Sequence, residues 1–332
     1  MKEFSEVRPS RIYQNRPSLE SILDEAGLKK EQLIMPIIIH EKRKIKEYEM
    51  MPGAVSDCEN EIFQSIYNGL DVGINSFILF GIPKTRNSKG TGALMSQGIV
   101  QRSTRKIRDE FGSRVQIITD VCICQYNKSG HCGITSSIGK DIENDTTTRL
   151  LSKIALSHAE SGADIVSPSS MMDGQVSRIR RLLNDNGFNN VKIMPFSAKH
   201  SSNLYAPFRA MAFNSKLQGK PYIDKSTYQL SYCNQREALR EIVVDINEGA
   251  DIVMIKPTLT YLDLLLMIRE SIGDFPIAIQ LVSGETAMIK AAAEHDWIDE
   301  SEWIVQTIAS AKRAGADKII SYASLDIANL VA

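Results

Sequence analysis

The sequence predicts a (β/α)8 barrel with an extended N-terminal arm, and three observations support this fold class. Short apolar runs alternate with amphipathic helical stretches about eight times along 332 residues, a chain length typical of such barrels. The apolar runs are continuous, as expected of parallel strands buried on both faces. The same tripeptide, Gly-Ala-Asp, joins helix to strand three times. No Gly-x-Gly-x-x-Gly follows the first apolar run, which argues against a dinucleotide-binding sheet.

The first segment, residues 1–31, reads as an arm that lies on its own barrel or on a neighbouring subunit. It is rich in Arg, Pro, Ser and Lys and carries too little apolar surface to fold alone. One helix is predicted over Ser18–Ala26, with Ser18 as its N-cap and Gly27 as its C-cap. The barrel domain then covers residues 32–332.

Each predicted strand is an apolar run of four to eight residues followed by a polar turn. The eight runs are Leu33–Ile39, Ser76–Phe80, Val115–Val121, Asp164–Ser167, Val191–Ser197, Asp251–Lys256, Pro276–Val282 and Asp317–Tyr322. In each tripeptide the glycine is expected to cap the preceding helix and the aspartate to open the strand. The tripeptides are Gly162-Ala163-Asp164, Gly249-Ala250-Asp251 and Gly315-Ala316-Asp317.

The composition is that of a globular protein with a sizeable core: 43% of the residues are hydrophobic and 24% are charged. A net charge of −1 does not suggest a basic surface that would bind nucleic acid or a membrane. The charged N-terminus has no apolar signal segment, and no apolar run is long enough to cross a bilayer. We therefore expect a cytoplasmic protein whose five cysteines are not structural disulfides.

Two lysines lie at the carboxyl ends of predicted strands, where barrel chemistry is found. Lys256 ends the run Asp251–Lys256 and is followed at once by Pro257, and Lys199 follows the run Val191–Ser197. Two cations at one barrel mouth repel each other, which makes each easier to deprotonate and so a better nucleophile toward a carbonyl. A single lysine at a strand end would more often extend to water.

Three cysteines lie within eleven residues after the third predicted strand: Cys122, Cys124 and Cys132. A Cys-x-Cys pair with a third thiolate on the returning loop fits a soft or borderline cation such as zinc, with the fourth position left for water or substrate. Ordinary loop cysteines and a redox pair are the alternatives. His131 adjoins Cys132 and is predicted to donate a hydrogen bond to the site rather than to bind the metal.

The stretch from about 201 to 234 is long for a loop between strand and helix, and it mixes aromatic and basic residues. A loop of this length in a compact domain is typical of an active-site lid. Its cations would suit a substrate that bears a carboxylate. An exposed insertion is the alternative.

Many short motifs, in order, resemble those of the porphobilinogen synthase (5-aminolevulinate dehydratase) family, in its zinc-cysteine branch. The resemblance runs from about Arg8 to the C-terminus. The motifs include Met51-Pro52-Gly53, Val100-Gln101-Arg102, Thr119–Cys124, Gly130–Gly133, Asn144-Asp145-Thr146, Met171–Gly174, Ser197-Ala198-Lys199, Met254–Pro257, Tyr261-Leu262-Asp263 and Val282–Glu285.

The resemblance implies a lyase of tetrapyrrole biosynthesis that condenses two 5-aminolevulinate molecules to porphobilinogen with loss of two waters. It implies that Lys256 forms the Schiff base and that Lys199 is its partner. It implies zinc on the three cysteines, an allosteric magnesium ion on Glu241, and an octamer embraced by N-terminal arms. The implied substrate-binding residues are Arg209, Lys225, Gln229, Ser283, Tyr322, Asp120 and Ser169.

Several positions depart from the family's usual residues. They are Ser170, Gln175, Phe196, Ala206, Ala210, Lys225 and Gln280, the last in place of a tyrosine. A lysine at position 225 loses the two-pronged grip of an arginine on a carboxylate. Two alternatives therefore stay open: an aldolase-like enzyme that forms an imine with another keto acid, and a catalytically silent relative.

Overall fold

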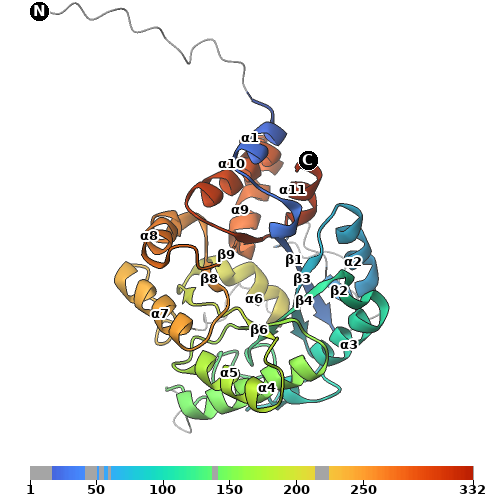
Figure 1. The fold of residues 1–332 in the computed structure, drawn as a ribbon, viewed down its shortest axis with the longest axis vertical. Coiled ribbons are helices and arrows are strands. Elements are labelled where there is room, and N and C mark those ends of the chain that lie inside the picture. The colour runs from blue at the N-terminus through green and yellow to red at the C-terminus, as the bar shows by residue number, and fades with distance from the viewer. Residues whose placement is uncertain are drawn as a thin grey trace, which may run out of the picture.

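The computed structural model describes residues 17–41, 51, 56–58, 61–136, 141–213 and 224–331. A ring of parallel strands lies at the centre and helices cover its outside (Figure 1). The strands are β1 Leu33–His40, β2 Ser56–Cys58, β3 Ser76–Ile82, β4 Gln116–Val121, β5 Ile165–Pro168, β6 Lys192–Ile193, β7 Ala198–Lys199, β8 Val253–Lys256, β9 Ile277–Gln280 and β10 Lys318–Ile320. The sheet order is β6-β5-β4-β3-β1-β10-β9-β8-β7, with β2 beside β1.

Seven of the eight predicted strands form as single strands, and the predicted barrel fold is confirmed. The prediction of one continuous fifth strand over Val191–Ser197 is wrong, because this segment forms β6, which pairs with β5, and then β7, which pairs with β8. Pro195 lies between them and has no N–H to give to a ladder. Ile193 O accepts from Asp251 N at 2.9 Å, which closes the barrel on the β8 side. The short strand β2 was not predicted.

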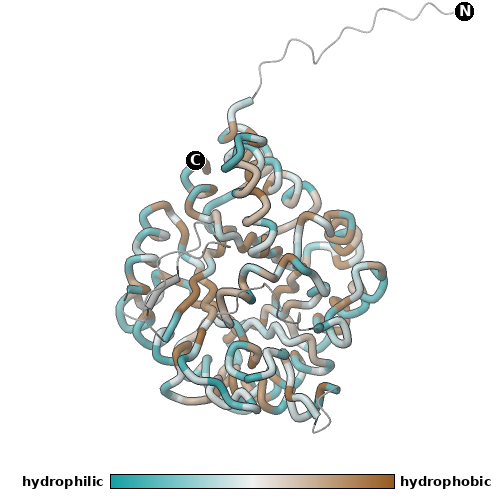
Figure 2. Tube along the Cα trace, turned by 180° about the vertical axis from the view of Figure 1, so that it is seen from behind, coloured by the Kyte–Doolittle hydropathy of each residue, from teal (hydrophilic) through white to brown (hydrophobic). Residues whose placement is uncertain are grey.

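Eleven described helices surround the strands, and most of them pack an apolar face on the outside of the sheet. They are α1 Leu19–Glu25, α2 Ile62–Asp71, α3 Ile99–Phe111, α4 Asn144–Glu160, α5 Gln175–Asp185, α6 Ala206–Phe213, α7 Gln235–Asn247, α8 Leu262–Ile272, α9 Ser283–Glu294, α10 Glu300–Arg313 and α11 Ser324–Leu330. The strands are apolar and buried, whereas hydrophobic and hydrophilic residues alternate along the outer helices (Figure 2). None of the described helices combines the length and apolarity that a membrane crossing needs.

Two layers of core hold the barrel. The larger lies between sheet and helices, and the smaller fills the barrel itself with side chains such as Ile34, Ile78, Ile118, Met194 and Phe196. A filled interior is the usual state of an eight-stranded barrel. The chemistry must therefore lie at one open end, above these side chains.

The Gly-Ala-Asp joints are braces between neighbouring units. Asp317 Oδ2 accepts from the backbone of Ile277, the first residue of β9, at 2.8 Å and also from Arg269 on α8, which in turn donates to Gly315 O. Gly315 has φ +110° and a Cβ there would lie 2.8 Å from Arg269, so only glycine fits. The same arrangement joins Asp164 with Arg108 and Ile117, and Asp251 with Arg180 and Ile193.

The N-terminal segment is described from residue 17 onward. The predicted helix is α1, whose N-cap Ser18 accepts from Ser21 N at 3.3 Å, and Gly27 follows its C-cap with φ +66°. Helix α1 lies beside α10 and α11 at one end of the molecule (Figure 1). The first sixteen residues of the predicted arm lie outside the described residues.

Candidate active site

A cavity opens at the carboxyl ends of the barrel strands, where the parallel arrangement brings side chains from distant segments together. Its volume is about 620 Å³ with the open mouth included. Ten of the predicted site residues line it: Asp120, Cys124, Ser169, Lys199, Arg209, Lys225, Gln229, Lys256, Ser283 and Tyr322. The sequence thus predicted most of the wall of one real cavity.

Lys256 and Lys199 end two adjacent strands and are register partners in the β7–β8 ladder. Lys256 Nζ donates to Gln280 Oε1 at 3.0 Å, and Lys199 Nζ donates to Ser169 O at 2.5 Å. The ring of Phe196 lies near both amines, with its centroid 4.5 Å from Lys256 Nζ and 5.7 Å from Lys199 Nζ. Both lysines are buried, so the two amines share a space with little water.

This environment lowers the pKa of Lys256 to about 7. Burial is the larger cause, because it penalises the charged ammonium, and the positive charge of Lys199 is the second. The repulsion predicted from the sequence is therefore present but is not the main effect. A substantial fraction of Lys256 is neutral near pH 7, which is the form that attacks a carbonyl.

A chain of hydrogen bonds links Lys199 to the cysteine loop. Ser169, whose carbonyl accepts from Lys199, donates its hydroxyl to Asp120 Oδ1 at 2.6 Å. Gln125 donates to Asp120 Oδ2 at 3.0 Å and accepts from Cys124 Sγ at 3.1 Å. Burial raises the pKa of Asp120 despite these bonds. The chain fixes the relative positions of an amine, a carboxyl group and a thiol.

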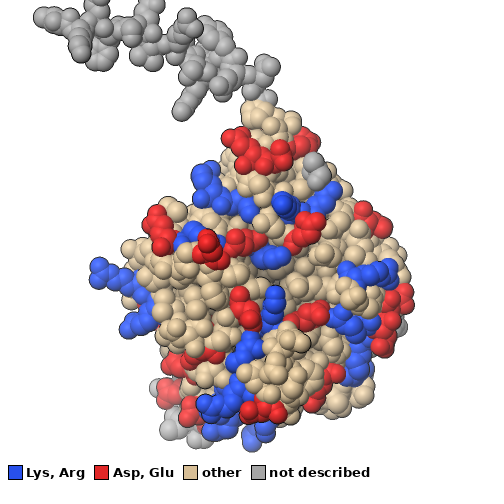
Figure 3. Space-filling view, viewed as in Figure 1, with Lys and Arg blue, Asp and Glu red and all other residues tan. Residues whose placement is uncertain are grey.

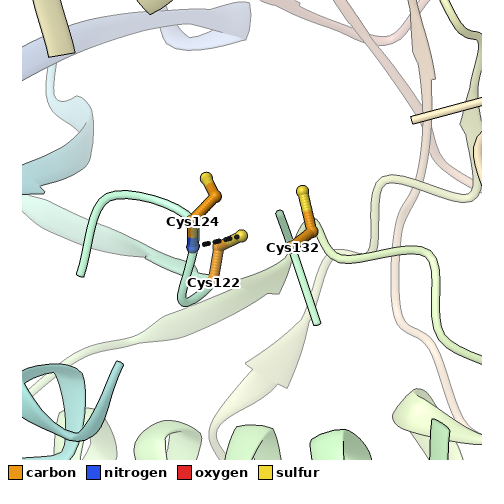
Figure 4. Close-up of side chains that lie close together, drawn as sticks. All are labelled: Cys122, Cys124 and Cys132. Carbon is orange, nitrogen blue, oxygen red and sulfur yellow. Dashed lines mark hydrogen bonds between the residues drawn. The ribbon is translucent and has the colours of Figure 1, made fainter. Parts of the chain in front are cut away.

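The three cysteines converge as predicted and could hold a metal ion. Their sulfur atoms lie within 4.8 Å of one another, with Cys122 and Cys124 on the segment after β4 and Cys132 on the returning segment (Figure 4). Hydrogen bonds from the other two thiols lower the pKa of Cys132, and Lys225, with Nζ 3.2 Å from its sulfur, also favours the thiolate. Burial raises the pKa of Cys122 to about 11. Ser170 donates to Cys122 Sγ at 3.4 Å.

His131 is not in this group of potential ligands among the described residues. Its Nδ1 lies 3.2 Å from Tyr228 Oη, which also accepts from Cys132 N at 3.1 Å. The ring of His131 and the backbone of Cys132 therefore share Tyr228 Oη as a hydrogen-bond partner. Its predicted role as a hydrogen-bond donor to the metal site remains a prediction.

The predicted lid contributes two described pieces, residues 201–213 and 224–234, and the stretch between them lies outside the described residues. The first piece contains α6, from which Phe208 and Arg209 reach the cavity, while Tyr205 precedes the helix. Ser283 ties this piece to α9, because its hydroxyl accepts from Phe208 N at 3.1 Å and donates to Leu204 O at 3.3 Å.

Glu241 lies apart from the active cavity. It lines a second cavity of about 950 Å³, again with the open mouth included, together with three further carboxylates, from Asp141, Asp173 and Glu237. Burial raises the pKa of Glu241, and the charge of Asp173 adds to the effect. Tyr228 and Gln229 also line this cavity, and Gln229 lines the active cavity as well.

Some site residues were not predicted from the sequence. Gln125 bridges Cys124 and Asp120, and its position directly after the cysteine pair was a usable signal. Glu285 is fully buried and accepts from the backbone of Thr258, Leu259 and Val282, which fixes the segment after Lys256. Gln280 was noted only as a departure from the family pattern.

Basic and acidic side chains are interspersed over the face seen in Figure 3. This agrees with the net charge of −1. Four basic side chains line the active cavity: Lys199, Lys256, Arg209 and Lys225.

Comparison with known proteins gives one consistent family. The family model described as delta-aminolevulinic acid dehydratase matches residues 6–330. A protein named delta-aminolevulinic acid dehydratase from Archaeoglobus fulgidus is 44% identical over 329 residues, covering 99% of each chain. One of the same name from Staphylococcus aureus is 38% identical over 311 residues, covering 93% of this chain and 94% of its own.

A solved structure agrees. The Toxoplasma gondii ME49 delta-aminolevulinic acid dehydratase (porphobilinogen synthase), crystallised with the reaction product porphobilinogen, superposes with a TM-score of 0.89 at 34% identity. The match covers 98% of this chain and 91% of that chain. The likeness therefore extends over the whole barrel and not only over the strand ends.

Proposed function

Because the chain belongs to the delta-aminolevulinic acid dehydratase family, we propose that it condenses two molecules of 5-aminolevulinate to porphobilinogen through an imine on Lys256. The observation that carries this proposal is the buried Lys256, whose pKa is lowered to about 7 beside Lys199 at the barrel mouth. Porphobilinogen synthesis is a lyase reaction in which two molecules of water leave.

Lys256 supplies the nucleophile. Its neutral Nζ forms a bond to the ketone carbon of the first substrate. One proton passes from the nitrogen to the former carbonyl oxygen, which takes up a second proton and leaves as water. The protonated imine that results withdraws electrons from the neighbouring carbon, which can then form the new carbon–carbon bond. Ser283 and Tyr322 line the cavity and are proposed to hold the carboxylate of this substrate. Asp120 and Ser169 are proposed to face its amino end.

Lys199, Arg209, Lys225 and Gln229 are proposed to bind the second substrate. The cations suit a carboxylate, and Gln229 Oε1 is buried with no donor among the described residues, so a ligand N–H would satisfy it. Lys225 offers a point charge where an arginine would offer two parallel hydrogen bonds, so we expect weaker affinity for this carboxylate.

The donor set supports zinc on Cys122, Cys124 and Cys132. Three sulfur atoms within 4.8 Å of one another match the preference of zinc for thiolates and leave a position open. Bound zinc would act as a Lewis acid that polarises an oxygen of the second substrate. The chain's own part is to hold the thiolates: Lys225 beside Cys132 offsets their negative charge, and Ser170 donates to Cys122.

We also propose that Glu241 binds magnesium at a distance from the chemistry. Four carboxylates line its cavity. Burial, and after it the charge of Asp173, raises the pKa of Glu241, and a divalent cation would offset both effects. A homo-octamer held by the N-terminal segment is the proposed assembly. Glu241→Gln is expected to abolish any magnesium stimulation, with the assembly size followed by sedimentation velocity. Equal stimulation in both proteins would remove this part of the proposal.

The activity is tested by incubating the protein with 5-aminolevulinate and detecting a pyrrole with a colour reagent. Pyrrole formation that requires Lys256 supports the proposal. An imine that borohydride traps without any pyrrole would instead favour an aldolase-like enzyme acting on another keto acid. Neither an adduct nor a pyrrole would indicate a silent relative.

A further inference from the structure

A buried amide lies directly against the proposed nucleophile. Gln280 is the last residue of β9, next to β8, and its Oε1 accepts from Lys256 Nζ at 3.0 Å. The side chain is 2% exposed and lines the same cavity. Given the proposed function of Lys256, on which this inference rests, we propose that Gln280 is a positioning residue. Its Oε1 accepts the same N–H of Lys256 Nζ from the free amine to the protonated imine. In the free amine this hydrogen bond directs the lone pair of Nζ into the cavity.

The surroundings of Nζ support this role. The ring faces of Phe196 and Tyr205 lie 4.5 Å and 5.2 Å away, measured from Nζ to each centroid, and such faces attract N–H groups. A neutral amine has two hydrogens and one lone pair. With one hydrogen on Gln280 and the other toward a ring, the lone pair remains for a carbonyl carbon that enters the cavity.

The proton balance allows the hydrogen bond to persist. The free amine carries two hydrogens on Nζ, the carbinolamine carries one, and the protonated imine carries one. The hydrogen that is lost from the amine passes to the former carbonyl oxygen as the carbinolamine forms, and this hydroxyl takes up a further proton to depart as water. Gln280 Oε1 can therefore accept from the same N–H in every one of these states.

A neutral acceptor suits the position. An amide oxygen orients the N–H without adding charge, whereas a carboxylate there would favour the ammonium form and keep the lone pair unavailable. The titratable groups that surround Lys256 are Lys199 from β7, Asp120 from β4, Cys124 and Cys132 from the loop after β4, Glu285 from α9, Tyr205 before α6 and Tyr322 after β10. A further carboxylate at position 280 would raise the pKa of Lys256 and so favour its protonated form.

Two variants test the proposal. Gln280→Glu is nearly isosteric and is expected to move the pH of half-maximal borohydride trapping upward by about one unit or more, because the carboxylate stabilises the ammonium. Gln280→Met keeps the length but has no acceptor oxygen. We expect kcat to fall about 10²-fold with KM little changed, the cost of a misaligned reacting atom. Gln306→Met, on the exposed face of α10, is the matched control and should behave as the parent protein.

The outcomes separate this inference from the proposed function. If the parent protein itself yields no adduct on Lys256, the proposed function fails. If the parent protein is trapped on Lys256 but both variants keep its pH profile and its rate, only the role of Gln280 is overturned. Should Gln280→Met fail to fold, the pH profile of the near-isosteric Gln280→Glu variant decides alone.

Discussion

Lys199 and Lys256 are register partners across two parallel strands, and both of their amines lie near one phenylalanine ring. Parallel pairing fixes the height of each residue along the barrel, so the proximity of the two amines is set by the backbone. The low pKa of Lys256 then follows from burial and from a neighbouring charge that cannot move far away.

Lys199→Met tests the electrostatic part of this arrangement. Removing the positive charge of Lys199 raises the pKa of Lys256, so a smaller fraction is neutral at a given pH. In the parent protein, trapping of the imine by borohydride should increase about tenfold per pH unit below 7 and level off above it. In the variant this rise should move to higher pH.

The control is Lys192→Met, which removes an exposed lysine at the start of β6 and should leave the profile unchanged. A Lys199→Met profile that coincides with that of the parent protein would show that the charge of Lys199 does not act on Lys256.

Cys124→Ala tests the proposed metal site. Two thiols hold zinc far more weakly than three, so we expect the variant to lose bound zinc on gel filtration and to lose pyrrole formation by about 10²-fold or more. Metal content is measured by mass spectrometry of the ion. Cys233→Ala removes an exposed cysteine outside the group and is the matched control. Full zinc content in Cys124→Ala would contradict the proposed zinc site.

Ser170→Ala tests the hydrogen bond to Cys122. Its hydroxyl is fully buried and donates to Cys122 Sγ at 3.4 Å, which stabilises a thiolate. Loss of such a partner typically lowers metal affinity about 10–100-fold. A competition titration against a zinc chelator measures the change, with Ser271→Ala on the exposed side of α8 as control. Equal zinc affinities of Ser170→Ala and the parent protein would mean that Ser170 contributes to packing alone.

Asp317→Ala tests the braces at the joints between units. The variant removes an acceptor from Ile277 N and from Arg269, and we expect the free energy of unfolding to fall by about 1–3 kcal/mol. Urea denaturation measures it. Asp109→Ala, at an exposed position of α3, should change it little. If the free energy of unfolding falls no more in Asp317→Ala than in this control, the hydrogen bonds of Asp317 do not stabilise the fold.

The repeating pattern of apolar runs and helices predicted the barrel because each unit is built from local signals. The rule that parallel strands end at one rim then placed Lys199, Lys256 and the cysteines together, and the structure does bring them together. The family and its porphobilinogen synthase activity, expected from the motifs, are confirmed by the family model and the relatives. The roles of individual site residues stay predictions.

What the sequence could not predict depends on long-range geometry. The partners of the three joint aspartates are Arg108, Arg180 and Arg269, which lie 56, 71 and 48 residues away. The break between β6 and β7 marks where pairing passes from β5 to β8, and side-chain periodicity carries no sign of that exchange. The contact of Gln280 with Lys256 likewise exists only once β8 and β9 are adjacent.

The most direct measurement is reduction with borohydride in the presence of 5-aminolevulinate, followed by mass spectrometry of the peptides. We predict one adduct, on Lys256, with half-maximal trapping near pH 7, and no pyrrole formation in Lys256→Met. An adduct on Lys199 instead, or pyrrole formation by Lys256→Met at the rate of the parent protein, would contradict the account.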